Sequence, residues 1–138
     1  MEIPEKYIMK LSGSVLEYGN DPRYDRKIKE RIFSKQNGCV VPVCYNYIHE
    51  IGSLVGMAEL KENEKGVAAD CYVIDTAFTR KVKELLESPC YELAVCINKV
   101  KTFTHGDETI VTEGNIREVS IVQVGYKPRF PFEVTENE

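Results

Sequence analysis

Cysteine and histidine are the side chains in this sequence best suited to nucleophilic or metal chemistry. The 138 residues include five cysteines and two histidines. The cysteines are odd in number, no two are spaced as C-x-x-C, and two histidines are few for a zinc site. Each cysteine lies in an apolar, strand-like run, which favours reduced and buried thiols. The five are Cys39, Cys44, Cys71, Cys90 and Cys96. We therefore predict neither a metal nor another cofactor.

Apolar and alternating runs predict the elements that must position any site. Strands are expected over residues 6–17, 39–46, 53–61, 67–74, 91–101, 109–112 and 114–124. Asp21 and Pro22 predict the start of a helix that ends at Asn37-Gly38, and Asp75 or Thr76 predicts the cap of a second helix over 77–87. Together they predict one α+β domain over residues 1–138: a mostly antiparallel β-barrel of about seven strands with two or more flanking helices.

Composition narrows the function classes. Hydrophobic residues make up 43% and charged residues 29%, a globular balance, and the formal net charge is -4. A mildly acidic domain lacks the basic surface that binds nucleic acid or anionic membranes. No apolar run approaches the roughly 20 residues of a membrane span, and the first six residues lack the layout of a signal peptide. We expect a soluble cytoplasmic protein without nucleic-acid or membrane partners.

Five weak motifs follow one another along the chain. They are VPVCYNYIH at 41–49, LVGMAEL at 54–60, EKGV at 64–67 with Asp75-Thr76 before the second helix, YELAVCINKVK at 91–101, and GNIREVSIV at 114–122. In their order and spacing they resemble the prohead (head-maturation) protease family of tailed phages, over roughly residues 10–130. The resemblance implies the fold of the herpesvirus assembly protease. It also implies a serine peptidase that trims scaffold and capsid proteins inside the immature head.

The resemblance carries a catalytic site with it: a serine nucleophile, a histidine base and a group that orients the base. Ala94 stands at the family serine position, and it has no hydroxyl to attack a carbonyl. The histidine position falls on Tyr47 when counted from the preceding strand and on His49 when counted back from the following one. Because these two are two residues apart, we expect them on the same side of a strand. Glu118 matches the third group.

A protease that lacks its nucleophile loses several orders of magnitude in rate. The resemblance therefore implies a pseudo-protease that serves as a capsid-assembly or decoration protein. Its expected partner is the major capsid protein or the scaffold protein, and self-association is a further expectation to test. Its expected location is the phage head or prohead, and the cytoplasm of the bacterial host during assembly.

Three alternatives stay open. Ala94 could be an engineered change in an active head-maturation peptidase. Cys96 could have replaced the serine if His49 or another cation lowered its pKa, although a shift of two residues moves the attacking atom about 6–7 Å along a strand. The chain could also be an unrelated small β-barrel binding module. His49 and Glu118 have plainer interpretations, as a polar residue at a strand end and as a carboxylate paired with a neighbouring cation.

Prolines and aromatic residues cluster beyond the last expected strand. They are Pro128, Phe130, Pro131 and Phe132. Side chains of this kind pack either on the open end of their own domain or on a capsid or sister subunit. The sequence slightly favours the first arrangement.

Overall fold

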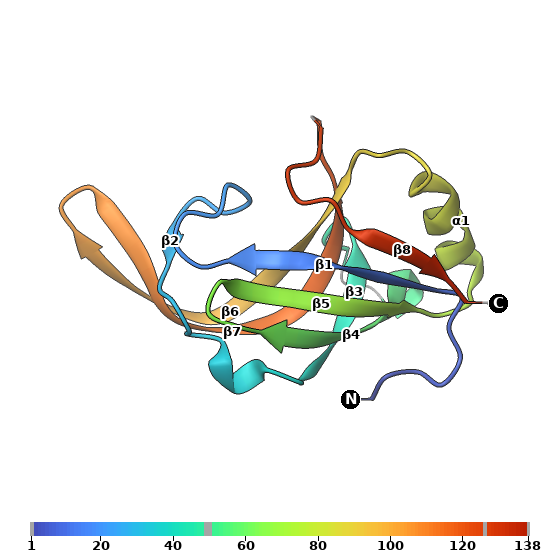
Figure 1. Ribbon diagram of the computed structural model, residues 1–138, viewed down its shortest axis with the longest axis horizontal. Coiled ribbons are helices and arrows are strands. Elements are labelled where there is room, and N and C mark those ends of the chain that lie inside the picture. Colours follow the sequence, from blue (N-terminus) through green and yellow to red (C-terminus); the bar gives the residue numbers. More distant parts are fainter. Residues whose placement is uncertain (1, 49–50, 126, 138) are drawn as a thin grey trace.

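A computed structural model describes residues 2–48, 51–125 and 127–137. The regular secondary structure of these residues consists of eight strands in one sheet, a single α-helix and two short 3-10 turns (Figure 1). The strands are β1 Met9–Glu17, β2 Lys27–Ile28, β3 Val40–Tyr45, β4 Leu54–Glu62, β5 Gly66–Val73, β6 Tyr91–His105, β7 Glu108–Gln123 and β8 Glu133–Glu136. The helix α1 spans Ala77–Leu85, and the 3-10 turns η1 and η2 span Ser34–Gln36 and Ile51–Ser53.

Strand β7 pairs with three other strands of the sheet. Strand β6 pairs antiparallel along one edge of β7, while β2 and β3 pair parallel with it at different points of the other edge. From β3 the sheet continues antiparallel through β4, β5 and β1 to β8. The strands that carry Ala94 and Glu118 are therefore neighbours.

The predicted barrel with two or more flanking helices is wrong, because the sheet is open between β1 and β6. The side chain of Arg23, which lies between β1 and β2 in sequence, crosses this gap in place of backbone pairing. Its Nη1 donates to the carbonyl oxygens of Ser14 at 2.8 Å and Leu93 at 3.0 Å. Its Nε and Nη2 bind the Asp21 carboxylate, and the ring of Phe130 lies 3.8 Å from the guanidinium carbon.

Tyr24 makes a second bridge across the same gap. Its hydroxyl donates to the carbonyl oxygen of Val15 at 2.6 Å and accepts the backbone N–H of Val95 at 2.9 Å. Two side chains thus satisfy backbone groups of β1 and β6 that face the gap. We call this gap, bridged by Arg23 and Tyr24, the seam.

The helix predicted to begin at Asp21 and Pro22 is also wrong. Asp21 does accept the N–H of Arg23, but in a local turn, and its other oxygen accepts the N–H of Glu17 at 2.7 Å. Ile28 then pairs with β7 as part of β2. The ion pair with Arg23 and the pairing of Ile28 hold the segment in an extended, turn-rich form, which overrides the helix-start signal.

The second predicted helix is confirmed as α1. Thr76 is its N-cap: the Thr76 hydroxyl accepts the N–H of Thr79, and the Thr79 hydroxyl accepts the N–H of Thr76. Val82 is buried on its inner face. No helix of the described residues is long and apolar enough to cross a membrane.

The last two predicted strands are one continuous strand, β7. It forms with β6 a long hairpin whose end projects away from the rest of the fold at the left of Figure 1. The turn of this hairpin lies at Gly106-Asp107. We call residues 99–113 of the hairpin the arm.

The C-terminal aromatic residues pack on their own domain, as the sequence slightly favoured. Phe130 covers Arg23, and β8 pairs with the edge of β1. Phe132 lies so close to Gly13 that a Cβ at residue 13 would sit 2.8 Å from the Phe132 Cβ. Glu92 is buried and accepts the N–H groups of Arg129 and Phe130, which fastens this segment to β6.

Candidate functional site

Of the residues that the resemblance assigns to chemistry, Ala94 lies on β6 and Glu118 lies on the neighbouring strand β7. Ala94 on β6 stands opposite Ser120 on β7, and Cys96 stands opposite Glu118. Cys44 on β3 faces Ser120 from the other side. Because side chains two apart on a strand share a face, these five lie on one face of the sheet. We call them the candidate site.

Ala94 lies near the start of β6 within this site. Its side chain is packed, with only 4% of the residue exposed, and its neighbour Ser120 is fully buried. The methyl group offers neither a nucleophile nor a proton donor. Glu118, the match for the third catalytic group, is also buried and lies on the adjacent strand, one paired position from Ser120 along the same face.

The histidine position falls in a turn rather than on a strand. Strand β3 ends at Tyr45, and Asn46 and Tyr47 adopt left-handed backbone conformations with φ of 49° and 61°. The expectation that residue 47 lies on a strand face is therefore wrong. His49 lies outside the described residues. The turn is held against the candidate site because the N–H of Tyr47 donates to the Ser120 hydroxyl oxygen at 2.9 Å.

The two thiols of the site and the nearby Tyr47 phenol favour their neutral forms. Burial, and after it the Glu118 carboxylate, raise the pKa of Cys96 to about 11. Burial also raises the pKa of Cys44 and that of the Tyr47 phenol. A reactive cysteine needs a lowered pKa and a cationic neighbour. Cys96 is thus a protonated thiol at neutral pH, the opposite of what a substitute nucleophile requires.

Sequence reasoning did not assign Ser120, Cys44 or Arg23 to the site. Ser120 had a usable signal, since it follows Glu118 by two residues in an alternating run. Cys44 was visible only as one of several thiols in apolar context. Arg23 had no signal at all, because its role depends on the approach of β6 to β1 in the folded chain. Its positive charge also acts on the Tyr47 phenol, lowering that pKa against the effect of burial.

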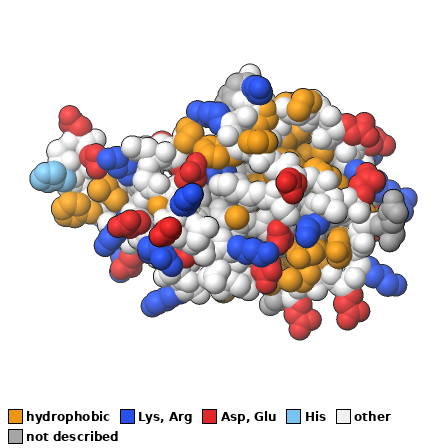
Figure 2. All heavy atoms as spheres, in the orientation of Figure 1, with side chains coloured by type: hydrophobic (Ala, Val, Ile, Leu, Met, Phe, Trp, Pro, Cys, Tyr) orange, Lys and Arg blue, Asp and Glu red, His pale blue; other side chains and the backbone are white. Residues whose placement is uncertain are grey.

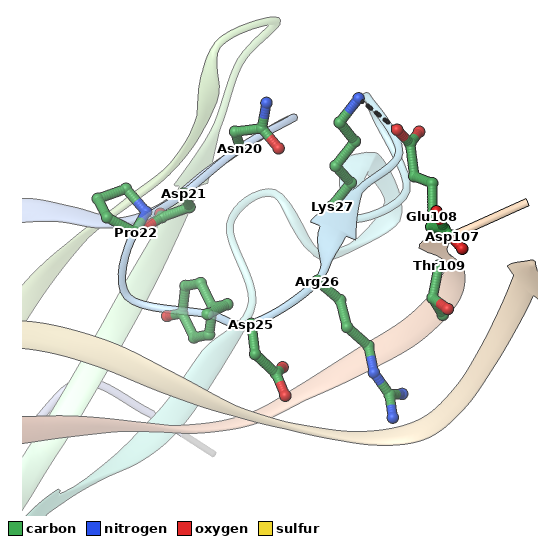
Figure 3. Close-up of a pocket in the computed structure, with 10 residues that line it drawn as sticks. Asn20, Asp21, Pro22, Asp25, Arg26, Lys27, Asp107, Glu108 and Thr109 are labelled. Carbon is green, nitrogen blue, oxygen red and sulfur yellow. Dashed lines mark ion pairs between the residues drawn. The ribbon is translucent and has the colours of Figure 1, made fainter.

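A pocket of about 880 Å³ lies away from these residues. It opens between residues 20–27 and the turn of the arm (Figure 3). Figure 3 shows Lys27 reaching across it to Glu108, with 3.0 Å between Nζ and Oε2. Basic side chains (Arg26 and Lys27) and several acidic side chains both line the pocket, so it does not present charge of a single sign to a ligand. Within the described part of the chain, no three His, Cys, Asp or Glu side chains are grouped to hold a metal ion.

Comparison of the chain with protein-family models, with curated proteins and with solved structures gave no match. The functional argument therefore rests on the five sequence motifs and on the arrangement of the candidate site.

Proposed function

We propose that this chain is a capsid-assembly or decoration protein of a tailed phage, related to prohead proteases but without peptidase activity. One observation carries the proposal: the residue at the position that resembles the family serine is Ala94, buried opposite Ser120 and one paired position from Glu118, which matches the third catalytic group. The position of the nucleophile therefore has no hydroxyl, while the carboxylate is present.

The arrangement of strands supports the relationship. The resemblance assigns the base, the nucleophile and the third group to segments far apart in sequence. In the structure the end of β3, the start of β6 and the end of β7 adjoin, and the turn at Tyr47 is hydrogen-bonded to Ser120 of β7. If the five weak motifs matched by chance, nothing would require these three segments to lie side by side in the folded chain.

The chemistry of the site supports the loss of activity. Ala94 has no hydroxyl, and the thiols of Cys44 and Cys96 have raised pKa values. A phenol such as Tyr47, whose pKa burial raises above the usual value near 10, is a poor base at neutral pH. None of these described groups can form an acyl-enzyme efficiently.

The proposed partner is the major capsid or scaffold protein, and the proposed location is the prohead inside the bacterial host. A shell presents many identical copies of its subunit. Linked weak contacts can then give retention that far exceeds the affinity of one contact. A binding role therefore does not require a deep active-site cleft.

The experiment is to assemble particles from the major capsid and scaffold proteins of the same genome with this chain present. We expect the chain to stay on purified particles and the capsid protein to keep its full mass. Trimmed capsid protein would overturn the assignment as a pseudo-protease. Untrimmed particles that carry none of the chain would overturn the structural role.

The second candidate is an active head-maturation peptidase in which Ala94 replaces the native serine. The retained Glu118 beside position 94 favours it. This candidate predicts that Ala94→Ser, a small change next to the Ser120 hydroxyl, restores cleavage of capsid or scaffold protein. Ala94→Gly is the matched control, because it also changes residue 94 but supplies no hydroxyl. A folded Ala94→Ser protein that leaves both proteins intact would exclude this candidate.

A further inference from the structure

The C-terminal segment, by which we mean residues 127–137, lies on the domain without entering its core. Each of these residues is exposed or half-buried, and none is buried. Strand β8 within the segment pairs through four residues with the edge of β1 that faces away from β5 (Figures 1 and 2). A segment held at the edge of a sheet opens at a lower free-energy cost than the core strands do. The C-terminal segment can therefore leave its place without unfolding the buried strands.

Two buried charged groups of the domain contact this segment directly. Glu92 is 2% exposed, and its Oε2 accepts the N–H of Arg129 at 2.7 Å and the N–H of Phe130 at 3.0 Å. The centroid of the Phe130 ring lies 3.8 Å from the guanidinium carbon of Arg23, whose side chain is 3% exposed. A buried carboxylate that loses such donors is costly. The domain therefore favours an occupant that supplies backbone N–H groups and an aromatic ring at these points.

Gly13 on β1 adds a steric requirement. A Cβ at this residue would lie 2.8 Å from the Cβ of Phe132, which is closer than two such atoms approach one another. The missing side chain thus leaves the room that Phe132 occupies. On the same strand, residues 9–12 pair with β8. We call Glu92, Arg23, Gly13 and the edge of residues 9–12 the docking site.

We propose that the docking site accepts the C-terminal segment of a second copy of this chain in place of its own. The segment of the second copy has the same sequence, so it supplies the same N–H groups, the same rings and the same strand. Exchanging an identical element keeps these contacts and changes only the connection between the domain and the segment. An unrelated partner would have to reproduce all of them with a different sequence.

The exchange depends on concentration. Within one chain a short connection presents the segment to the docking site at a roughly millimolar effective concentration. A second copy therefore competes when the chains are crowded together or when the internal contact is weakened. Reciprocal exchange closes a two-fold symmetric pair. This inference does not depend on the proposed function, because it concerns the isolated chain. Exchange and retention on particles can each fail without the other.

The test mixes two full-length variants that each lack one half of the contact. Gly13→Ala fills the space of Phe132 but keeps an intact segment, whereas Phe130→Ala/Phe132→Ala removes both rings but keeps an intact docking site. Sedimentation velocity should show one-to-one complexes in the equimolar mixture and monomers of each variant alone. Phe103→Ala removes an exposed ring on the arm and is the matched control. It should associate with Gly13→Ala at least about tenfold more weakly, because its own segment still fills the docking site.

A labelled peptide of residues 127–137 gives a second measurement, which does not need the Gly13→Ala variant to fold. The peptide should bind Phe130→Ala/Phe132→Ala at least about tenfold more tightly than it binds the wild type, whose own segment competes. A scrambled peptide of the same composition should not bind.

Circular dichroism verifies that the variants are folded. The proposal would be overturned by a folded Phe130→Ala/Phe132→Ala chain that does not bind the peptide, or by equal binding of the peptide and its scrambled form. Complexes formed by either variant alone would overturn it too, because they require a different contact. An unfolded Phe130→Ala/Phe132→Ala chain would do the same, since the segment would then be indispensable to the core.

Discussion

The two halves of strand β6 share one partner strand but have opposite surroundings. Residues 91–95 are all buried, whereas residues 99–105 are all exposed. Both halves pair with β7, so the backbone ladder does not explain the difference. The seam side chains and the C-terminal segment cover the first half, and no described element covers the second. Pairing with β7 therefore fixes the direction of both halves, whereas the side chains and segments packed against β6 determine which half is buried.

The sharpest way to test this contrast is to remove the side chain that bridges the seam. The Arg23 and Asp21 side chains are 3% and 0% exposed. Arg23→Met keeps a long apolar stem but leaves the Asp21 charge buried without its cation, which typically costs about 3–5 kcal/mol. Urea denaturation should show a loss of this size in the free energy of unfolding.

The double variant Arg23→Met/Asp21→Asn serves as the control, because it also removes the stranded charge. It should recover part of the lost stability. A loss below about 1 kcal/mol for Arg23→Met, the range of exposed ion pairs, would mean that the seam does not stabilise the buried half of β6.

A smaller loss is expected when only one hydroxyl of the seam is removed. Tyr24→Phe leaves the carbonyl of Val15 and the N–H of Val95 without that partner, and an unsatisfied buried group costs about 1–3 kcal/mol. Thermal unfolding measures the loss, and the Val95 amide should exchange faster with solvent. Tyr72→Phe is the matched control, since the Tyr72 hydroxyl makes no hydrogen bond among the described residues. Equal stability of the two variants would contradict the bridging role.

The smallest effect is expected on the arm. Lys27→Ala removes the ion pair with Glu108. The Lys27 side chain is 39% exposed and the Glu108 side chain is 48% exposed. Exposed pairs contribute roughly 0–1 kcal/mol, so the free energy of unfolding should change by no more than that. Urea denaturation of the variant beside the wild type measures it. A loss comparable to that of Tyr24→Phe would show that the arm unfolds together with the core, and the contrast between the halves of β6 would then be one of exposure only.

Local signals predicted the elements that depend on local contacts. The helix after Thr76 follows from its cap and its spacing of apolar residues, and both features act within a few residues. The signal at Asp21 is of the same kind, yet it failed, because Arg23 competes for the carboxylate and holds the backbone against β1 and β6. The open seam was likewise beyond prediction, since it depends on side chains that reach across strands distant in sequence.

The candidate site was predictable in part. The alternation along β6 and β7 correctly places Ala94 and Cys96 on one face and Glu118 and Ser120 on one face. The roles of these positions are proposals that come from the family resemblance and not from the alternation. The turn at Tyr47 could not be foreseen, because the Tyr47 N–H is held by the hydroxyl of Ser120, a residue far away in the sequence.

The seam also determines where the fold would yield to mechanical force. Pulling β1 away from β6 has to break the side-chain hydrogen bonds of Arg23 and Tyr24, whereas pulling β6 from β7 has to break a long backbone ladder. Parting β1 from β6 therefore breaks fewer hydrogen bonds than parting β6 from β7, and local opening begins where fewer cooperative bonds must be lost. A chain loaded across the seam would widen this gap before β6 separated from β7.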